Sequence, residues 1–342
     1  MDNQAPGQRA RDLNSYFRRR FRFQPEKYIG GTIVYKRRKR NGTVERIIVK
    51  HELTPEGDEG HERERKTLLR LWGAEHIVKL LSFQLLPSNK GKAWRRPDNR
   101  DNAGQLLAWK LSIDPHRYPG ILGNPFFVVE YLARGTVSEL IGRCRAHNIR
   151  TISQSLLWSF FLCLTRACAG MLHPQNIRGR TPAQNWRETL PGQGSESKVI
   201  HGDLHTKNAM FGDSNANNPA DLDCHVTLRA QRENIRRVGE LMHQMALLRV
   251  EADLYLISDL QRASFVFDDG RETFRTWAKP AILNRHTLSP GFRALVCKCM
   301  AVDIRKRPKL HEVLRRCEDE VAAIDNWGPH FANELSALFD EP

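Results

Sequence analysis

The chain has 342 residues, of which 40% are hydrophobic and 27% charged, and a formal net charge of +15. This length fits two domains or one two-lobed unit, and the composition is that of a globular protein. We expect no membrane partner, since no apolar run approaches the length that crosses a bilayer. Seven cysteines without a C-x-x-C spacing, and no signal peptide at the start, predict an intracellular protein of the cytoplasm or nucleus without disulfides.

The positive charge is concentrated near the N-terminus. Residues 1–50 hold 14 Lys or Arg against 4 Asp or Glu, with runs at 18–20 and 36–40. Because residues 1–22 are polar and charged, we expect a basic, disordered or loosely held tail. Basic runs can bind nucleic acid. Since the second run leads into a hairpin signal, we interpret it mainly as a solvated turn, and a nucleic-acid partner is the less favoured alternative.

The first predicted structure is a hairpin. Residues 29–35 have strand composition and include the adjacent glycines Gly30 and Gly31. Asn41-Gly42 is a strong signal for a tight turn, and residues 44–50 form the returning strand, which ends at a lysine.

A helix and a buried strand follow. Residues 60–71 have helix-forming composition with Leu68 and Leu71 at the spacing of one face. Residues 86–124 are rich in Pro, Gly, Asn and charges, which predicts an insertion of unknown role. Residues 126–132 are almost continuously apolar and predict a buried strand.

The second half of the chain is predicted to be mostly helical. Apolar residues recur at three and four residue spacing over 156–171, so a long helix capped by Ser153 should be buried. Residues 174–197 are polar with Pro and Gly and predict a second insertion. Residues 311–324 and 331–339 have amphipathic helical patterns.

A polar loop, His-Gly-Asp-Leu-His-Thr-Lys-Asn, occupies residues 201–208 after two apolar residues. A carboxylate at Asp203 can orient a hydroxyl, and the amide oxygen of Asn208 can ligate a hard cation without adding charge. The pattern resembles the catalytic loop of the eukaryotic-type protein kinases, His-x-Asp-Leu-x-x-x-Asn. The resemblance implies that Asp203 is the catalytic base and that Asn208 binds Mg2+.

Other motifs follow in the order of that family over about residues 25–320. Ile47-Ile48-Val49-Lys50 resembles the family's strand Lys, which implies that Lys50 contacts the phosphates of ATP and pairs with a helix glutamate. Residues 74–81 resemble the family's junction between this helix and the fourth strand, and counting back from that junction makes Glu64 the partner, with Glu62 and Arg65 within a register slip. Gly30 and Gly31 would approach the phosphates, although the pair falls short of Gly-x-Gly-x-x-Gly. The residues implied to surround the nucleotide are Gly30, Gly31, Ile48, Lys50, Val129, Glu130 and Leu132.

The chain departs from the family pattern after the catalytic loop. The second Mg2+ ligand is interpreted as Asp223, which follows an aliphatic residue as in the family, and Asp221 is an alternative. Residues 234–242 resemble the start of the next conserved helix, yet only residues 226–233 separate it from His225. Eight extended residues span roughly 26 to 29 Å, which leaves no room for an activation loop or a peptide-binding platform.

Two further departures agree with this loss. Gly202 stands where regulated kinases carry the Arg that binds an activation-loop phosphate. Arg307, in a segment that resembles the end of the family's large lobe, lacks the glutamate that normally pairs with it. We therefore expect Arg307 to find another partner or to stay hydrated, since an unpaired buried guanidinium is costly.

These patterns predict an α+β, two-lobed protein-kinase-like fold. The small β-rich N-lobe is expected over residues 23–130, the larger helical C-lobe over 131–325, and a C-terminal extension over 326–342. The implied function is Mg2+-dependent phosphoryl transfer from ATP to a protein Ser/Thr hydroxyl, and the protein substrate is unknown. Two alternatives stay open. One is a pseudokinase that acts as a binding or scaffold module, and the other is a small-molecule phosphotransferase, because aminoglycoside and choline phosphotransferases also use His-Gly-Asp-Leu-His.

Overall fold

The structure is a computed structural model, and the residues that it describes are 7–51, 58–71, 74–83, 126–174, 188, 190, 204–212, 224–226, 231–249, 264–268, 270, 272–324, 333–334 and 337–339. The predicted insertion at 86–124 lies outside these residues. So does the predicted insertion at 174–197, except for Pro174, Glu188 and Leu190.

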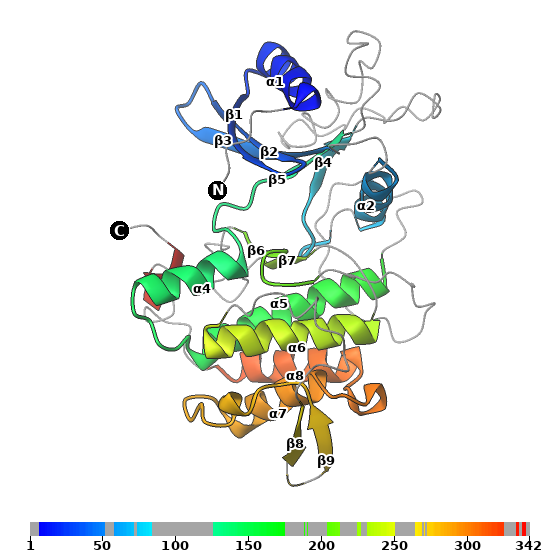
Figure 1. Ribbon diagram of the computed structural model, residues 1–342, viewed down its shortest axis with the longest axis vertical. Coiled ribbons are helices and arrows are strands. Elements are labelled where there is room, and N and C mark those ends of the chain that lie inside the picture. Colours follow the sequence, from blue (N-terminus) through cyan, green and yellow to red (C-terminus); the bar gives the residue numbers. More distant parts are fainter. Residues whose placement is uncertain are drawn as a thin grey trace. The chain divides into compact units, whose positions relative to one another are not determined.

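The fold is mixed α+β and divides into two compact units (Figure 1). Unit 1 comprises residues 1–72 and 78–131, and unit 2 comprises residues 73–77 and 132–342. Among the described residues, unit 1 contains a five-stranded sheet with two helices, and unit 2 is mainly helical. The division after Tyr131 falls one residue from the predicted boundary between the two lobes.

The sheet of unit 1 is antiparallel between all neighbouring strands. Its order is β1-β2-β3-β5-β4, with β1 (Gln24–Ile29), β2 (Thr32–Arg38), β3 (Val44–His51), β4 (Leu80–Phe83) and β5 (Phe126–Glu130). The turn between β2 and β3 is the one predicted at Asn41-Gly42. There Gly42 has φ of 83° and the N–H of Lys39 donates to the carbonyl of Thr43 at 2.8 Å. Asn-Gly chemistry therefore sets this hairpin.

The prediction that Gly30 and Gly31 lie inside a strand was wrong, because the pair forms the turn between β1 and β2. Gly30 has φ of 53°, a conformation that favours glycine. At Gly31 a Cβ atom would lie 2.3 Å from the carbonyl oxygen of His51, so a side chain does not fit there. The N–H of His51 also donates to the Gly31 carbonyl at 2.7 Å. The turn is thus fastened to the end of β3.

The expected tail over residues 1–22 was also wrong, since Gln8–Phe21 form helix α1. The helix buries five residues at helical spacing, and Phe17 stacks on Tyr35 of β2 with ring centroids 4.7 Å apart. These five are Ala10, Leu13, Tyr16, Phe17 and Phe21. They join one core with Ile33, Ile47 and Val49 of the sheet. An apolar stripe can anchor a helix even when its average composition is strongly polar.

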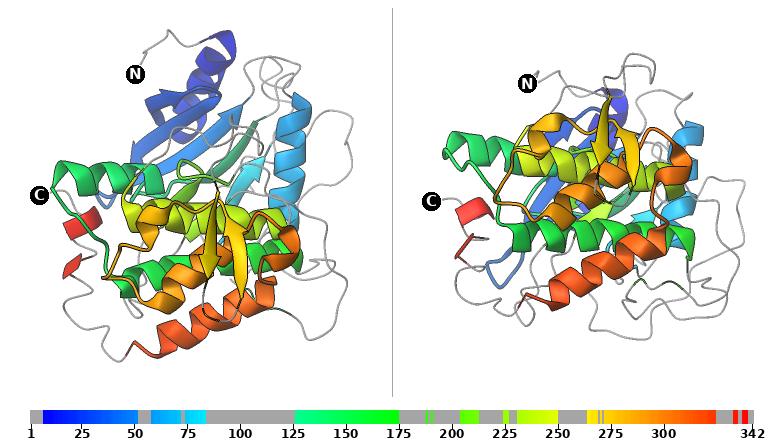
Figure 2. Two further views of the ribbon diagram at one scale, coloured as in Figure 1. Left: turned by 60° about the horizontal axis from the view of Figure 1, so that its bottom comes forward. Right: turned by 90° about the horizontal axis from the view of Figure 1, so that it is seen from below.

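Helix α2 (Asp58–Arg70) lies close to its predicted range of 60–71 and completes unit 1. Unit 2 contains α4 (Val137–Ala146), α5 (Gln154–Leu172), α6 (Gln231–Leu247), α7 (Pro290–Cys299), α8 (Leu310–Ala322), two short 3-10 helices, and the strand pairs β6 (Ala209–Phe211) with β7 (Cys224–Val226) and β8 (Phe265–Asp268) with β9 (Thr273–Thr276). Helix α5 contacts both α6 and α8, and the three lie side by side (Figure 2).

The predicted helix around residues 156–171 is α5. Its first turn is capped as predicted, because the Leu156 N–H donates to the Ser153 hydroxyl at 3.2 Å. By length and composition α5 could cross a membrane, contrary to the sequence expectation, but 94% of its apolar window is buried inside the protein. That burial is typical of the core helix of a globular protein.

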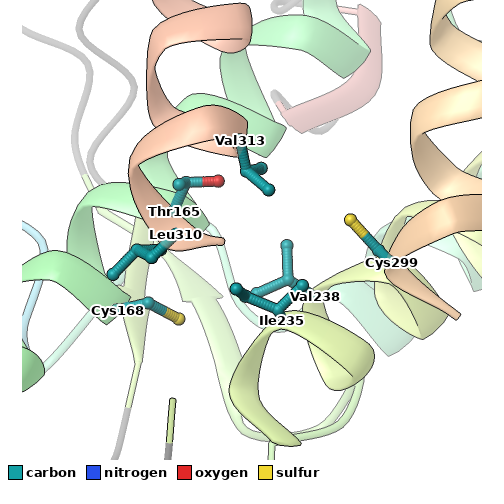
Figure 3. A pocket seen from close by; sticks show the side chains of 7 residues that line it. All are labelled: Thr165, Cys168, Ile235, Val238, Cys299, Leu310 and Val313. Carbon is teal, nitrogen blue, oxygen red and sulfur yellow. The ribbon is translucent and has the colours of Figure 1, made fainter. Parts of the chain in front are cut away.

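The space between α5, α6 and α8 is closed by packing. Thr165, Cys168, Ile235, Val238, Cys299, Leu310 and Val313 line it (Figure 3). It is too narrow to hold a water molecule. Six cysteines in the described part of the chain are free and buried, and two of them, Cys168 and Cys299, face this space. The region is core rather than a ligand pocket.

The predicted C-terminal helices lie in unit 2. Helix α8 covers most of 311–324, and the described parts of 331–339 include the buried residues Leu338 and Phe339. The guanidinium of Arg143 on α4 donates to the Leu338 carbonyl at 3.0 Å. The end of the predicted C-terminal extension therefore packs on the helical unit.

Candidate functional site

A lysine and a glutamate from two different elements of unit 1 form an ion pair. The ammonium of Lys50 on β3 lies 2.7 Å from Oε1 of Glu64 on α2, and each side chain is 28% exposed. The pairing is the one predicted from the helix register, and the rival Arg65 is instead buried. The contact is confirmed, whereas its part in catalysis stays a prediction.

The alternation of β3 explains why Lys50 reaches α2. Ile47 and Val49 face the core formed with α1, so Ile48 and Lys50 point to the opposite face of the sheet. Ile48 pairs with Val129 across the ladder, and both are buried. Three of the residues implied to surround the nucleotide, Ile48, Lys50 and Val129, therefore share one face.

Phe127 also belongs to this face, although the sequence analysis did not single it out. It pairs with Lys50 in the β3–β5 ladder, and the Lys50 ammonium lies 5.9 Å from its ring centroid. A cation at this distance is attracted by the ring face. The signal was present in the period-2 pattern of residues 126–130, where Phe127 and Val129 alternate with residues of the other face.

The glycine turn lies beside the same lysine. Thr32, which directly follows the turn, pairs with Lys50 across β2 and β3. Together with the hydrogen bond between Gly31 and His51, this register places Gly30 and Gly31 at the end of the sheet that carries Lys50. The structure thus brings the predicted phosphate-contacting residues of unit 1 together.

Glu130 and Leu132, which are also implied to surround the nucleotide, differ in their surroundings. The Glu130 carboxylate accepts from the Lys79 N–H at 2.7 Å, and the Glu130 N–H donates to the Lys79 carbonyl at 3.1 Å, so this residue ties β5 to the start of β4. The Leu132 carbonyl accepts from Gly135 at 3.3 Å. Within the described part of the chain no acceptor contacts the Leu132 N–H, so a ligand could use this donor.

In unit 2 the polar loop is described from Leu204 onward. Leu204 and Thr206 are buried, the Thr206 carbonyl accepts from Ser138 at 2.9 Å, and the half-buried Asn208 donates its N–H to the His205 carbonyl at 2.9 Å. These bonds hold the loop against the start of α4. The predicted base Asp203 lies outside the described residues.

Asp223 and its alternative Asp221 also lie outside the described residues, but the register of β6 and β7 bears on them. Ala209, which follows Asn208, pairs with Val226, whereas Phe211 pairs with Cys224, which follows Asp223. Asn208 therefore precedes the Ala209 end of this ladder, and Cys224, the described residue next to Asp223 in the sequence, lies at the other end. The part of Asp223 as a second Mg2+ ligand stays a prediction.

The connection after β7 is shorter than the sequence alone indicated. Strand β7 ends at Val226 and α6 begins at Gln231, so residues 227–230 alone join them. Four residues span at most roughly 14 Å. The expectation that no activation loop or peptide platform fits here is therefore strengthened.

Comparison with known proteins assigns the chain to no family. No protein-family model and no curated protein sequence matches the chain. The kinase resemblance therefore depends on the order of its motifs and on contacts such as Lys50 with Glu64.

Arg307 has partners that the sequence analysis did not identify. It is buried, its Nε donates to the Ala301 carbonyl at 2.9 Å, and its guanidinium lies 5.4 Å from the Trp277 ring centroid. Its Nη1 is also 3.6 Å from Glu233 in the first turn of α6. Burial raises the pKa of Glu233, but Arg236 first, and then Arg237 and Arg307, hold it below its usual value. Glu233 thus supplies charge where the family's glutamate is absent.

A second acid–base pair in unit 2 is fully buried. The Glu188 carboxylate accepts from the His76 N–H at 2.8 Å and contacts His76 Nδ1 at 2.6 Å. Both side chains are at most 2% exposed. Burial lowers the pKa of His76, but hydrogen bonds with Cys163 and Glu188 outweigh it and raise the pKa to about 10. The imidazole is therefore charged at neutral pH.

Glu75 adds a third potential metal ligand to this pair, with its ligand atom within 4.8 Å of the other two. The arrangement nevertheless favours an ion pair over a metal site. Both oxygens of Glu188 are already used by His76, and a charged imidazole cannot ligate a cation. Gly170 makes room for the acid, because a Cβ there would lie 2.7 Å from Glu188 Cγ. We interpret the pair as a structural contact that holds Glu188 against α5 and residues 74–77.

Proposed function

We propose that this chain binds ATP and that its two units are the lobes of a kinase-like fold. The observation that carries the proposal is the 2.7 Å ion pair between Lys50 and Glu64. An ammonium held by one carboxylate, partly exposed, and placed next to a glycine turn is suited to receive phosphate oxygens.

Other residues of the same face of the sheet support nucleotide binding. Ile48 and Val129 form a buried apolar lining beside Lys50, and the Phe127 ring lies on one side of the lysine. In the segment that follows β5, the Leu132 N–H is a donor of the kind that reads the edge of a base. ATP supplies the transferable phosphoryl group when bound. The role of Lys50 is then to hold the phosphates in place, and the role of Glu64 is to orient Lys50.

Phosphoryl transfer to a protein Ser/Thr hydroxyl is the reaction that the motif around Asp203 supports. In this role Asp203 accepts the hydroxyl proton, and Asn208 is a candidate Mg2+ ligand. Asp223 is the candidate for a second Mg2+ ligand.

The short connection of residues 227–230 favours a second candidate, a nucleotide-binding module with little or no transfer, since a protein substrate would have no platform. A small-molecule acceptor would also dispense with that platform. The candidates differ in whether label from ATP is transferred and in which acceptor receives it.

Thermal unfolding tests nucleotide binding. Millimolar ATP should raise the Tm of the full chain, since any ligand selective for the folded state stabilises it. Lys50→Met should abolish the shift. Lys27→Met removes an exposed lysine from β1 of the same sheet and should keep it. If wild type shows no shift, or if both variants behave alike, the ATP-binding proposal fails.

Transfer is tested separately with labelled ATP, with and without EDTA. Label on the protein or on a basic test substrate that disappears in Asp203→Asn supports transfer with Asp203 as the base. A Tm shift by ATP that EDTA leaves unchanged, together with no label, supports the module without transfer. Label that persists in Asp203→Asn contradicts the assignment of the base.

A further inference from the structure

Unit 1 carries a group of arginines that have no partner within the described part of the chain. We call them the basic surface, and they are Arg18, Arg19, Arg20 and Arg22 at the end of α1 and Arg38 and Arg40 at the turn between β2 and β3. All six are exposed. Residues 7–51 as a whole hold 14 Lys or Arg against 3 Asp or Glu. The nearby carboxylates already form ion pairs with other basic residues, since Glu26 binds Lys36 and Arg46, and Glu45 binds Arg37.

The fold joins two basic runs that are separate in the sequence. Arg37 of β2 donates to the Phe21 carbonyl at the end of α1 at 3.3 Å, and its guanidinium lies 4.6 Å from the ring centroid of Phe23. This contact brings Arg37, in the 36–40 run, against Phe21, which directly follows the 18–20 run. Figure 1 shows α1 lying over the sheet.

The surface is also held in a fixed shape. The apolar face of α1 is buried on the sheet, with Phe17 fully buried against Tyr35, so the arginines project from a folded element rather than from a tail. The helix dipole explains a preference for some cations in the last turn of α1. It does not explain Arg38 and Arg40, which lie outside the helix.

We propose that the basic surface binds the phosphate backbone of a nucleic acid duplex. All six members are arginines, whose planar guanidinium matches phosphate oxygens in pairs. A membrane-binding helix would need an apolar face free for lipid, and the apolar face of α1 is already buried. A single-strand site would need exposed aromatic rings for stacking, but Tyr16, Phe17 and Phe21 of α1 are buried.

Binding of this kind has a defined signature. Because the contacts are to phosphates, affinity should depend little on base sequence and steeply on salt. If about five phosphates are neutralised, log Kd should change by about 4 to 5 per tenfold change in salt, from about 0.9 per phosphate. The inference does not depend on ATP binding and holds whether or not the proposed function does.

The experiment measures fluorescence anisotropy of two labelled 20-bp duplexes of unrelated sequence, titrated with the full chain between 50 and 200 mM KCl. Arg19→Gln with Arg20→Gln, and separately Arg38→Gln with Arg40→Gln, should each weaken binding at least about fivefold and lower the salt slope by about 2. Arg305→Gln with Arg315→Gln removes the same charge from exposed positions of unit 2 and should change Kd less than about twofold.

Other outcomes overturn the proposal. Absence of binding at 50 mM KCl does so directly, and equal weakening by the unit 2 variant shows that net charge alone is responsible. Polyglutamate of equal charge that displaces the duplex as well as unlabelled duplex does would assign the surface to an acidic protein. Tighter binding to phosphatidylserine vesicles than to the duplex would assign it to a membrane. Unchanged Tm values of the variants show that any loss reflects the surface rather than unfolding.

Discussion

The carboxylates of Glu64 and Glu188 each bind one basic side chain, yet their surroundings differ in almost every respect. Glu64 meets Lys50 through one oxygen, and both side chains are 28% exposed. Glu188 uses both oxygens on His76, and the two side chains are at most 2% exposed. The first pair is accessible to a ligand, whereas burial closes off the second.

The comparison shows how burial separates function from stability in chemically similar pairs. Exposed pairs contribute about 0 to 1 kcal/mol because water and salt screen them. Breaking a buried pair is costly because one charged group is left without its partner. We therefore expect Glu188 to govern stability and Glu64 to govern ligand binding, and each expectation can be measured.

The largest effect is expected for Glu188→Gln. The variant keeps the shape of the side chain but removes the charge that His76 faces, so the free energy of unfolding should fall by about 3 kcal/mol, the low end for a broken buried pair. The low end applies because His76 can release its proton. Urea denaturation of both proteins measures the difference.

Glu318→Gln is a matched control for that variant. Glu318 lies 3.6 Å from Arg166 and its side chain is 46% exposed. Its replacement should cost less than about 1 kcal/mol. Equal losses in the two variants would show that burial does not distinguish the pairs.

A smaller, graded effect is expected from pH. The pKa of His76 is about 10 in the folded chain and about 6.5 ordinarily, so the folded state binds more protons between these values. The stability from the pair is therefore present below about pH 6.5 and is lost as pH rises toward 10. Burial also raises the pKa of Cys168 and Cys297 to about 12, but these thiols affect stability only above about pH 9.

The measurement that isolates His76 is the difference in unfolding free energy between wild type and Glu188→Gln. This difference should shrink between pH 7 and pH 9, before the thiols contribute. A difference that stays constant over this range would show that the imidazole is not charged in the folded state.

The contrast between the two pairs also explains how much of the site could be predicted. The contact between Lys50 and Glu64 could be predicted because both belong to motifs that resemble those of the kinases, and the motif at residues 74–81 fixed the count along the helix. His76 and Glu188 are 112 residues apart, and neither residue lies in a helix or strand. No local pattern connects them, and the pairing required the fold.

The errors have physical causes as well. Averaged over residues 1–22, the arginines concealed the apolar spacing of α1, although Leu13, Tyr16 and Phe17 already mark one helical face. Gly30 and Gly31 were placed in a strand because their neighbours are apolar, while the close approach of the His51 backbone makes them a turn.

The smallest stability effect, and the sharpest contrast with Glu188, is expected for Glu64→Gln. Because the pair with Lys50 is partly exposed, unfolding free energy should change by less than about 1 kcal/mol. The Tm shift produced by ATP should nevertheless shrink, since Lys50 loses the group that orients it. Paired measurements of Tm with and without ATP test both points. A stability loss as large as that of Glu188→Gln, with the ATP shift intact, would make this pair structural and remove the observation on which the proposed nucleotide site depends.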